Sequence, residues 1–304
     1  MTAFLLMLLL VLGAGWYVQW ASSWIDKGAS AWWFVVGAPI AYLAPALVLV
    51  SFWFMLSWIW RTPRPPEARL DLKGALRLYW NELWVVGVSW PLMALHGLFN
   101  RDPRPAPAAR PVLLVHGVLV NDGVWIAFRR YLSRRGIRPI YTINYGPPLA
   151  DIELFAEQLE RKIEAIRAAT GAERVVLIGH SMGGLVARAY LRRCGGARVA
   201  RLITLGAPHH GSVFAFLFPG RDLAQMHPGN PWLAELNRDE AAAAPAPIVS
   251  IWSRHDSMVA PQASSELANA ENVALIGVAH NALLADAEVR RRTVQEIGKV
   301  PDRV

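Results

Sequence analysis

The sequence contains a single cysteine among 304 residues and few charged side chains. One cysteine excludes a scaffold held by disulfides and a zinc site built from several cysteines. Charged residues make up 18% of the chain and hydrophobic residues 54%. This balance excludes an intrinsically disordered chain, which combines low hydrophobicity with high charge. The length allows one large domain or two smaller ones.

Charge is scarcest at the N-terminus. Up to Trp60 only Asp26 and Lys27 are charged, so the net charge of +8 lies entirely in the rest of the chain. The uncharged runs 3–25 and 28–60 each exceed the roughly 20 residues that cross a bilayer. Trp and Tyr gather near their ends, as at membrane interfaces. We expect transmembrane helices near 3–25 and 33–58. A cleaved signal peptide is the alternative for the first run, but no basic residue precedes Lys27.

Basic residues and a Trp-rich segment follow the second run. The basic ones are Arg61, Arg64, Arg69, Lys73 and Arg77. The positive-inside rule places this flank in the cytoplasm, which predicts a multi-pass protein of the inner membrane. The periodicity of 70–99 indicates an amphipathic helix at the membrane interface. A third span over 83–99 is the alternative, and it would move the rest of the chain to the other side.

A Pro-rich stretch at 101–111 divides the chain. We therefore expect two transmembrane helices in 1–60, an interfacial segment and linker in 61–105, and a globular domain in 106–304. Arginines cluster at 129–138 and at 290–292 without a nucleic-acid-binding motif, so we expect no nucleic-acid partner. Attraction to anionic lipid headgroups is one interpretation of these clusters, and a solvated helix face is the other.

Strand and helix patterns alternate in the globular domain. Short apolar runs predict strands at 111–117, 139–145, 174–180, 200–208, 247–253 and 272–278, and helical spacing predicts helices at 121–135, 151–170, 182–193 and 282–297. This alternation predicts an α/β fold, with a mostly parallel sheet covered by helices on both faces.

The segment GHSMG at 179–183 fits the pattern G-x-S-x-G between a predicted strand and a predicted helix. That context is the one a nucleophile elbow requires, because a tight turn lifts the serine above the sheet edge. Gly179 and Gly183 have no Cβ atoms, so the predicted strand and helix can approach each other closely at this turn. Ser181 is therefore the candidate nucleophile.

A serine nucleophile needs a base and an orienting carboxylate. His280 follows the last predicted strand and Asp256 follows the strand before it. Both fall beyond the carboxyl ends of strands, where open parallel sheets build their sites. Asp222 and Asp286 are rival acids, but neither follows a predicted strand.

The same chemistry needs two N–H groups to hold an oxyanion. One should come from Met182, directly after the nucleophile. The other should come from the loop after the first strand, where Val118 is the candidate and Leu119 the alternative. We expect a structural role for His116.

These pieces together resemble the bacterial lipase and esterase branch of the α/β-hydrolases. The matching segments are HG at 116–117, GHSMGG at 179–184, TLGAPHHGS at 204–212, HDSMV at 255–259 and VAHNALL at 278–284. The resemblance implies the α/β-hydrolase fold and hydrolysis of carboxylic esters through an acyl-enzyme on Ser181, Asp256 and His280. Several lipases of this group also carry a calcium site, but the sequence shows no set of carboxylates that we assign to one, and we expect no cofactor or metal. It places His209 and His210 in a loop beside the site, where we expect structural roles.

The insertion at about 209–246 is interpreted as lid-like, with Phe214 and Phe216, together with Leu119, lining an acyl pocket; a satellite core is the alternative. The sequence thus predicts a membrane-anchored serine hydrolase acting on lipid-like esters. An acyltransferase with the same triad and a catalytically silent membrane scaffold are the alternatives.

Overall fold

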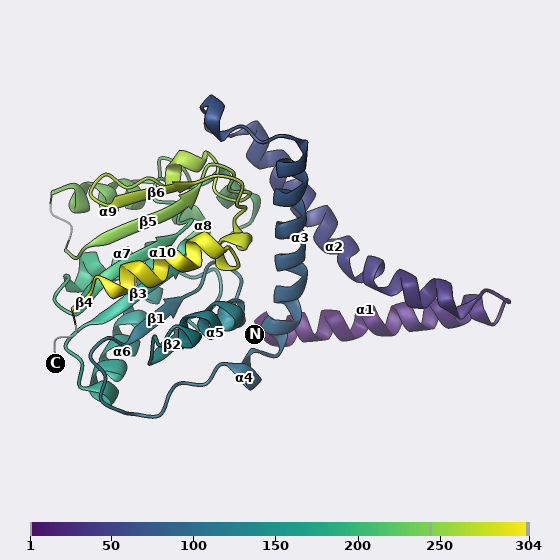
Figure 1. Ribbon diagram of the computed structural model, residues 1–304, viewed down its shortest axis with the longest axis horizontal. Coiled ribbons are helices and arrows are strands. Elements are labelled where there is room, and N and C mark those ends of the chain that lie inside the picture. The colour runs from purple at the N-terminus through teal and green to yellow at the C-terminus, as the bar shows by residue number, and fades with distance from the viewer. Residues whose placement is uncertain (1, 243–244, 302–304) are drawn as a thin grey trace.

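The computed structural model describes residues 2–242 and 245–301 (Figure 1). Its centre is a six-stranded sheet in the order β2-β1-β3-β4-β5-β6, in which all neighbours are parallel. The strands are β1 (Val112–Val115), β2 (Ile140–Ile143), β3 (Val175–His180), β4 (Val199–Leu205), β5 (Ile248–Ser253) and β6 (Glu271–Leu275). Each lies within or beside a predicted range, so the parallel α/β sheet is confirmed.

Helices cover both faces of the sheet because its strands are apolar on both sides. One face packs against α6 (Ile152–Thr170), α7 (Met182–Cys194) and α9 (Pro231–Ala242). The other packs against α5 (Ile126–Arg134) and α10 (Ala287–Gly298). Successive residues of β1 divide between the two cores, Leu113 facing one and Leu114 the other, as the two-residue period of a strand requires.

Local signals explain where two helices begin and end. The Asp151 carboxylate accepts a hydrogen bond from the Glu153 N–H at the start of α6, and Gly171, with φ of 70°, ends that helix. The helix predicted over 282–297 is wrong at its start. A short 3₁₀ helix (Asn281–Leu284) comes first, and Asp286 then caps α10 by accepting from the N–H groups of Glu288 and Val289.

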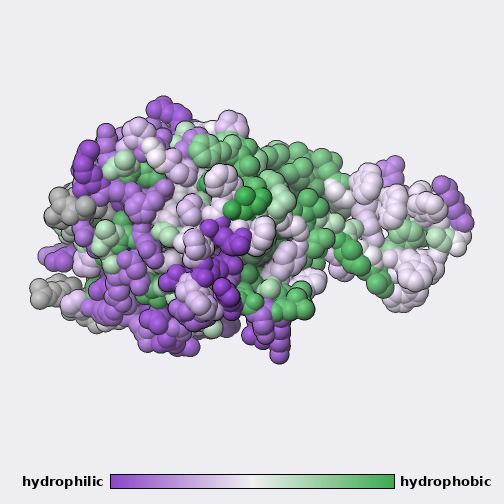
Figure 2. Space-filling view, turned by 90° about the horizontal axis from the view of Figure 1, so that it is seen from above, coloured by the Kyte–Doolittle hydropathy of each residue, from purple (hydrophilic) through white to green (hydrophobic). Residues whose placement is uncertain are grey.

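Two long N-terminal helices extend away from the sheet domain (Figure 1). α1 (Thr2–Ile25) and α2 (Ala31–Ile59) are long and apolar enough to cross a membrane, and no residue of the most apolar stretch of α1 is buried. The hairpin between them lies far from the sheet, whereas the start of α1 and the end of α2 lie near it. Hydrophobic residues gather over the part of these helices between the hairpin and the sheet domain, in contrast to the more hydrophilic surface of the sheet domain (Figure 2).

α3 (Leu72–Ala94) lies between the long helices and the sheet domain, and the short α4 (His96–Phe99) follows it. Its Leu83 and Val86 pack with Ala46 and Val50 of α2. Its Trp80 and Trp84 are exposed on another face. Leu78 joins the core of the sheet domain. α3 is therefore in direct contact with that domain, and its position at a membrane interface stays a prediction.

The remaining short elements are 3₁₀ turns in the connecting loops. They are η1 (Pro66–Ala68), η2 (Asp122–Trp125), η3 (Val213–Leu217) and η4 (Gln262–Ser265). A short α-helix, α8 (Arg221–Gln225), also lies in a connecting loop. η2 follows β1, and η3 and α8 lie in the insertion between β4 and β5. The loops after β1, β4 and β5 lie beyond the carboxyl ends of these strands, where the site is built.

Candidate active site

Ser181 lies in a strained turn between β3 and α7. Its φ of 56° and ψ of −130° belong to a region that residues other than glycine rarely adopt. A Cβ atom on Gly183 would lie 2.2 Å from the Val115 carbonyl oxygen, and one on Gly179 would lie 2.6 Å from the Gly183 carbonyl oxygen. The glycines thus allow the close approach that the turn needs, and the geometry is that of a nucleophile elbow.

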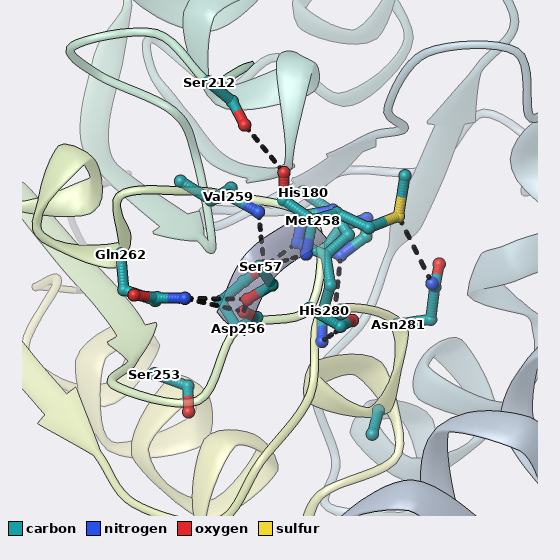
Figure 3. Close-up of polar contacts among 12 residues, drawn as sticks. Ser57, His180, Ser212, Ser253, Asp256, Met258, Val259, Gln262, His280 and Asn281 are labelled. Carbon is teal, nitrogen blue, oxygen red and sulfur yellow. Dashed lines mark hydrogen bonds and ion pairs between the residues drawn. The ribbon is translucent and has the colours of Figure 1, made fainter. Parts of the chain in front are cut away.

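Asp256 and His280 form a buried pair in the loops after β5 and β6 (Figure 3). The Asp256 Oδ2 lies 2.9 Å from the His280 Nδ1. The other carboxylate oxygen accepts hydrogen bonds from the N–H groups of Met258 and Val259, at 2.8 and 2.7 Å. This arrangement places a proton on Nδ1 and leaves Nε2 as the basic atom of the ring.

The charge balance around His280 favours its protonated form. Burial lowers the pKa of His280, but the charge of Asp256, the hydrogen bond with it and the charge of Glu82 outweigh that effect. The net result is a pKa above the ordinary 6.5. Such a ring accepts a proton readily and holds it beside a carboxylate, which is the behaviour of a general base.

Ser181 and His280 line the same cavity, which has a volume of about 480 Å³. Its wall is mainly apolar, and Val118, Leu119 and Phe214 also lie on it. The volume falls within the range of ordinary ligand pockets. The structure therefore brings the predicted nucleophile and the predicted base to one side of the sheet, as the proposed triad requires.

Of the two predicted oxyanion residues, Val118 lines this cavity, whereas Met182 directly follows Ser181 and lines a neighbouring cavity. Met182 is the first residue of α7, so its N–H has no acceptor within the helix. Val118 lies in the loop after β1, and Leu119 beside it has a positive φ of 56°. A Cβ atom on Gly117 would lie 3.0 Å from the Ser181 Cβ, so this loop passes directly over the nucleophile.

Two further residues predicted to contact substrate, Phe214 and Phe216, differ in whether they reach the cavity. Phe214, in η3, is buried and lines the cavity. The structure does not bring Phe216 to it: Phe216 is exposed and its ring centroid lies 4.0 Å from that of His227. Side chains two apart in a 3₁₀ helix point in different directions, so only the first of the pair reaches the cavity.

The other histidines near the site have structural contacts. Burial lowers the pKa of His116 to about 4, and its ring stacks on Tyr145 at 4.2 Å. Burial likewise lowers the pKa of His180 to about 3, and its Nε2 donates to the His280 carbonyl oxygen at 3.1 Å. His209 is buried between Arg188 and Thr204. His210 lies 3.1 Å from the Asn237 amide nitrogen.

The rival acids have other partners. Asp286 is the cap of α10. Asp222, whose pKa burial raises to about 6, lies on a separate cavity with Met182 and Tyr145. Over residues 2–242 and 245–301, no group of three or more His, Cys, Asp or Glu side chains is placed to hold a metal ion.

Glu82, on α3, supports the loop that carries His280. Its buried carboxylate accepts four hydrogen bonds: from the hydroxyl of Ser257 at 2.8 Å, from the N–H and the amide nitrogen of Asn281 at 3.1 and 2.9 Å, and from the N–H of Ala282 at 2.9 Å. Sequence reasoning missed this residue. The available signal was an acidic residue in the apolar stripe of a helix, four residues from Leu78 and four from Val86.

α2 supports the loop that carries Asp256. The buried Ser57 hydroxyl donates to the Asp256 carbonyl oxygen at 2.7 Å, and the Gln262 amide nitrogen lies 2.8 Å from the Ser57 hydroxyl (Figure 3). Thr62 exchanges hydrogen bonds with Gln262 and Ala263. The turn around Asp256 is therefore fixed against the end of α2.

The end of α3 and the start of α4 support the loop on the oxyanion side. The Asn121 amide donates to the Met93 carbonyl oxygen at 2.9 Å. The His96 Nδ1 lies 2.6 Å from the Asp122 carboxylate, which also accepts from Thr142. Residues 57–96 thus contact the loops on both sides of Ser181.

Comparisons with known proteins agree with this fold. The family described as PGAP1-like alpha/beta domain matches residues 141–282. Aspergillus fumigatus lipase B has a similar structure, with a TM-score of 0.62, 15% identity and coverage of 92% of this chain and 84% of that one. Mature Bacillus licheniformis lipase BlEst2 gives a TM-score of 0.55 at 19% identity, covering 66% of this chain and 96% of that one. The fold is that of the α/β-hydrolases.

Curated relatives match part of the chain. A triacylglycerol lipase from Burkholderia plantarii is 34% identical over 148 residues, which are 42% of this chain and 41% of the relative. A 1-acylglycerol-3-phosphate O-acyltransferase from Sus scrofa is 28% identical over 125 residues, 39% of this chain and 32% of the relative. The chain thus spans less than half of the length of these relatives. The matched part of the chain is similar to triacylglycerol lipases and to an acyltransferase.

Proposed function

We propose that the protein is a serine hydrolase that cleaves carboxylic esters of lipid-like substrates through an acyl-enzyme. The observation that carries this proposal is the Asp256–His280 pair on the same apolar cavity as Ser181 in its elbow. The lipase relatives and the apolar wall support an ester with a hydrophobic acyl part. The positions of these residues assign Ser181 as the nucleophile, His280 as the general base and Asp256 as the acid that orients it.

The reaction has two halves. The His280 Nε2 takes the proton of the Ser181 hydroxyl as its oxygen attacks the ester carbonyl carbon, and the N–H groups of Val118 and Met182 hold the resulting oxyanion. His280 passes the proton to the departing alcohol, which leaves the acyl group on Ser181. Water then attacks the acyl carbon while His280 takes its proton, the acid departs, and the proton returns to the serine oxygen.

A fluorophosphonate probe tests this proposal. Folded wild-type protein should be labelled at Ser181, and Ser181→Ala should not be labelled. Turnover of an ester should fall on the order of 10⁶-fold in the same variant, as loss of a triad serine does elsewhere. No labelling of the wild type would leave the catalytically silent scaffold as the better description.

Transfer of the acyl group to an alcohol is a second candidate, favoured by the similarity to an acyltransferase. The same acyl-enzyme would form, and an alcohol would replace water in its second half. The two reactions are separated by their products when glycerol or a lysophospholipid is added to the assay. Ester formation in excess of free acid would favour the transferase.

We further propose that α1 and α2 span a membrane and that the hydrolase domain faces the cytoplasm. The start of α1 and the end of α2 lie on the side of the hydrolase domain, as a two-span hairpin requires (Figure 1). Five basic residues between Arg61 and Arg77 follow α2, and this flank favours the cytoplasmic side. The exposed Trp80 and Trp84 of α3 suit a position at the membrane surface.

A further inference from the structure

The cavity that contains Ser181 has a second wall, which comes from the N-terminal helices. This wall includes Leu5, Leu6 and Leu9 of α1, Leu49 and Trp53 of α2, and Trp90 and Met93 of α3. The opposite wall is formed by the hydrolase domain and includes Phe214 and Met258. The candidate transmembrane helices thus form part of the same cavity as the proposed nucleophile.

We propose that this wall is the binding site for the acyl chain of a membrane lipid ester, which reaches Ser181 laterally from the bilayer. The inference rests on the proposed ester hydrolase and adds the route and the chain contact of its substrate. It assigns a substrate-binding role to helices that would otherwise serve only as an anchor.

The chemistry of the cavity matches an amphiphile. The hydrolase side of the cavity supplies polar side chains, among them Ser181, His280 and Asn281, so an ester carbonyl fits beside Ser181. The wall on α1 and α2 has only aliphatic and aromatic side chains. An ester group at Ser181 with its chain along Leu5 and Leu9 therefore meets a matching surface over its whole length.

Exposure of the wall explains how a chain would enter. Leu5 is 54% and Leu9 59% exposed, although both line the cavity. The apolar surface continues along the helices (Figure 2). Moving an acyl chain through water carries an unfavourable free energy for every methylene group. A continuous apolar surface from helix to cavity avoids that step.

Full-length protein in phosphatidylcholine vesicles tests the inference with two substrates, 4-nitrophenyl palmitate and 4-nitrophenyl acetate. Leu9→Trp should narrow the space for a long acyl chain beside α1. The ratio of kcat/KM for palmitate to that for acetate should therefore fall at least about tenfold. Leu12→Trp is the matched control: Leu12 is one turn further along α1, is also exposed and does not line the cavity. Its ratio should stay within about twofold of the wild type. An unchanged ratio in Leu9→Trp, or an equal change in both variants, would overturn the inference.

A second measurement does not depend on a variant. A fluorophosphonate with a sixteen-carbon chain and a diazirine near the end of that chain would react with Ser181 and then crosslink on illumination. Crosslinks should fall within 5–9 or 49–53, whereas crosslinks confined to 213–226 would overturn the inference. If a short-chain fluorophosphonate also failed to label the wild type, the proposed hydrolase itself would be wrong, so the two failures are distinguishable.

Discussion

The Glu82 carboxylate on α3 accepts two hydrogen bonds from Asn281, one from its backbone N–H and one from its side chain. Asn281 directly follows the proposed catalytic histidine. A residue 199 positions earlier in the chain therefore fixes the backbone beside His280. Since Glu82 also contributes to the raised pKa of His280, it acts on the base through both position and charge.

Glu82→Gln should separate these effects from simple loss of folding. A glutamine keeps the size of the side chain but places an NH₂ group among donors, so part of the support is lost. We expect kcat to fall about 10- to 100-fold, because small displacements of a reacting group have costs of that order. The acidic limb of the kcat/KM profile should also move to lower pH, because one negative charge near His280 is removed.

Glu67→Gln is the control for this prediction, because Glu67 is exposed in the turn before α3. Its pH profile should match that of the wild type. A purely structural role for Glu82 would reduce activity without moving the acidic limb, and that outcome would contradict the prediction.

The pH dependence of the wild type follows from the state of His280. A general base must be neutral, and the net effect of Asp256 and Glu82 raises the pKa of His280 above 6.5 despite its burial. The kcat/KM of the free enzyme should therefore decline as the pH falls through a midpoint above 6.5. Measurement of initial rates from pH 5 to 9 checks this, and a midpoint below 6.5 would count against the assignment.

Asp256→Asn should lower kcat on the order of 10⁴-fold, as the corresponding change does in other triads. The amide removes the negative charge and offers a donor to the ring, so Nδ1 no longer carries the proton and Nε2 loses its basic role. Initial rates at a fixed pH measure the effect. Asp286→Asn, at the cap of α10, should retain nearly full activity, and the reverse ranking would identify Asp286 as the true acid.

Gly183→Ala should destabilise the protein by about 3 kcal/mol or more. The new Cβ would lie 2.2 Å from the Val115 carbonyl oxygen and 2.5 Å from that of His116. Both contacts are with backbone, which cannot rotate away, so strand and helix must separate. Gly298→Ala is the control, since a Cβ there meets nothing within 4 Å. Unfolding midpoints in detergent compare the two, and equal midpoints would contradict the elbow geometry.

The membrane arrangement is testable by cysteine labelling in a Cys194→Ser background. Lys27→Cys, in the hairpin between α1 and α2, should react with a membrane-impermeant maleimide in intact cells. Arg291→Cys, on the exposed part of α10, should react only after permeabilisation. Labelling of Arg291→Cys in intact cells would place the hydrolase domain outside the cytoplasm and support a third span over 83–99.

Sequence periodicity and motif order were sufficient to predict the fold, and they also gave the residues of the triad, which stays a proposal. A strand followed by G-x-S-x-G and a helix constrains the backbone locally, so Ser181 could be identified from neighbours within a few residues. Asp256 and His280 were identified because each directly follows a predicted strand, in the order acid and then histidine. Glu82 and Ser57 could not be found in this way, because their partners lie about 200 positions away. The amphipathic pattern of 70–99 indicated a membrane surface and concealed the face that contacts the hydrolase domain.

Ser57 and Glu82 lie outside residues 141–282, the part of the chain that matches the PGAP1-like family, yet they hold the turns around Asp256 and His280. A chimaera that joined these helices to another hydrolase domain would bring a hydroxyl and a carboxylate without their acceptor and donors. The two parts of the chain are therefore not interchangeable modules. Over evolution, positions 57 and 262, and positions 82 and 257, should change in pairs.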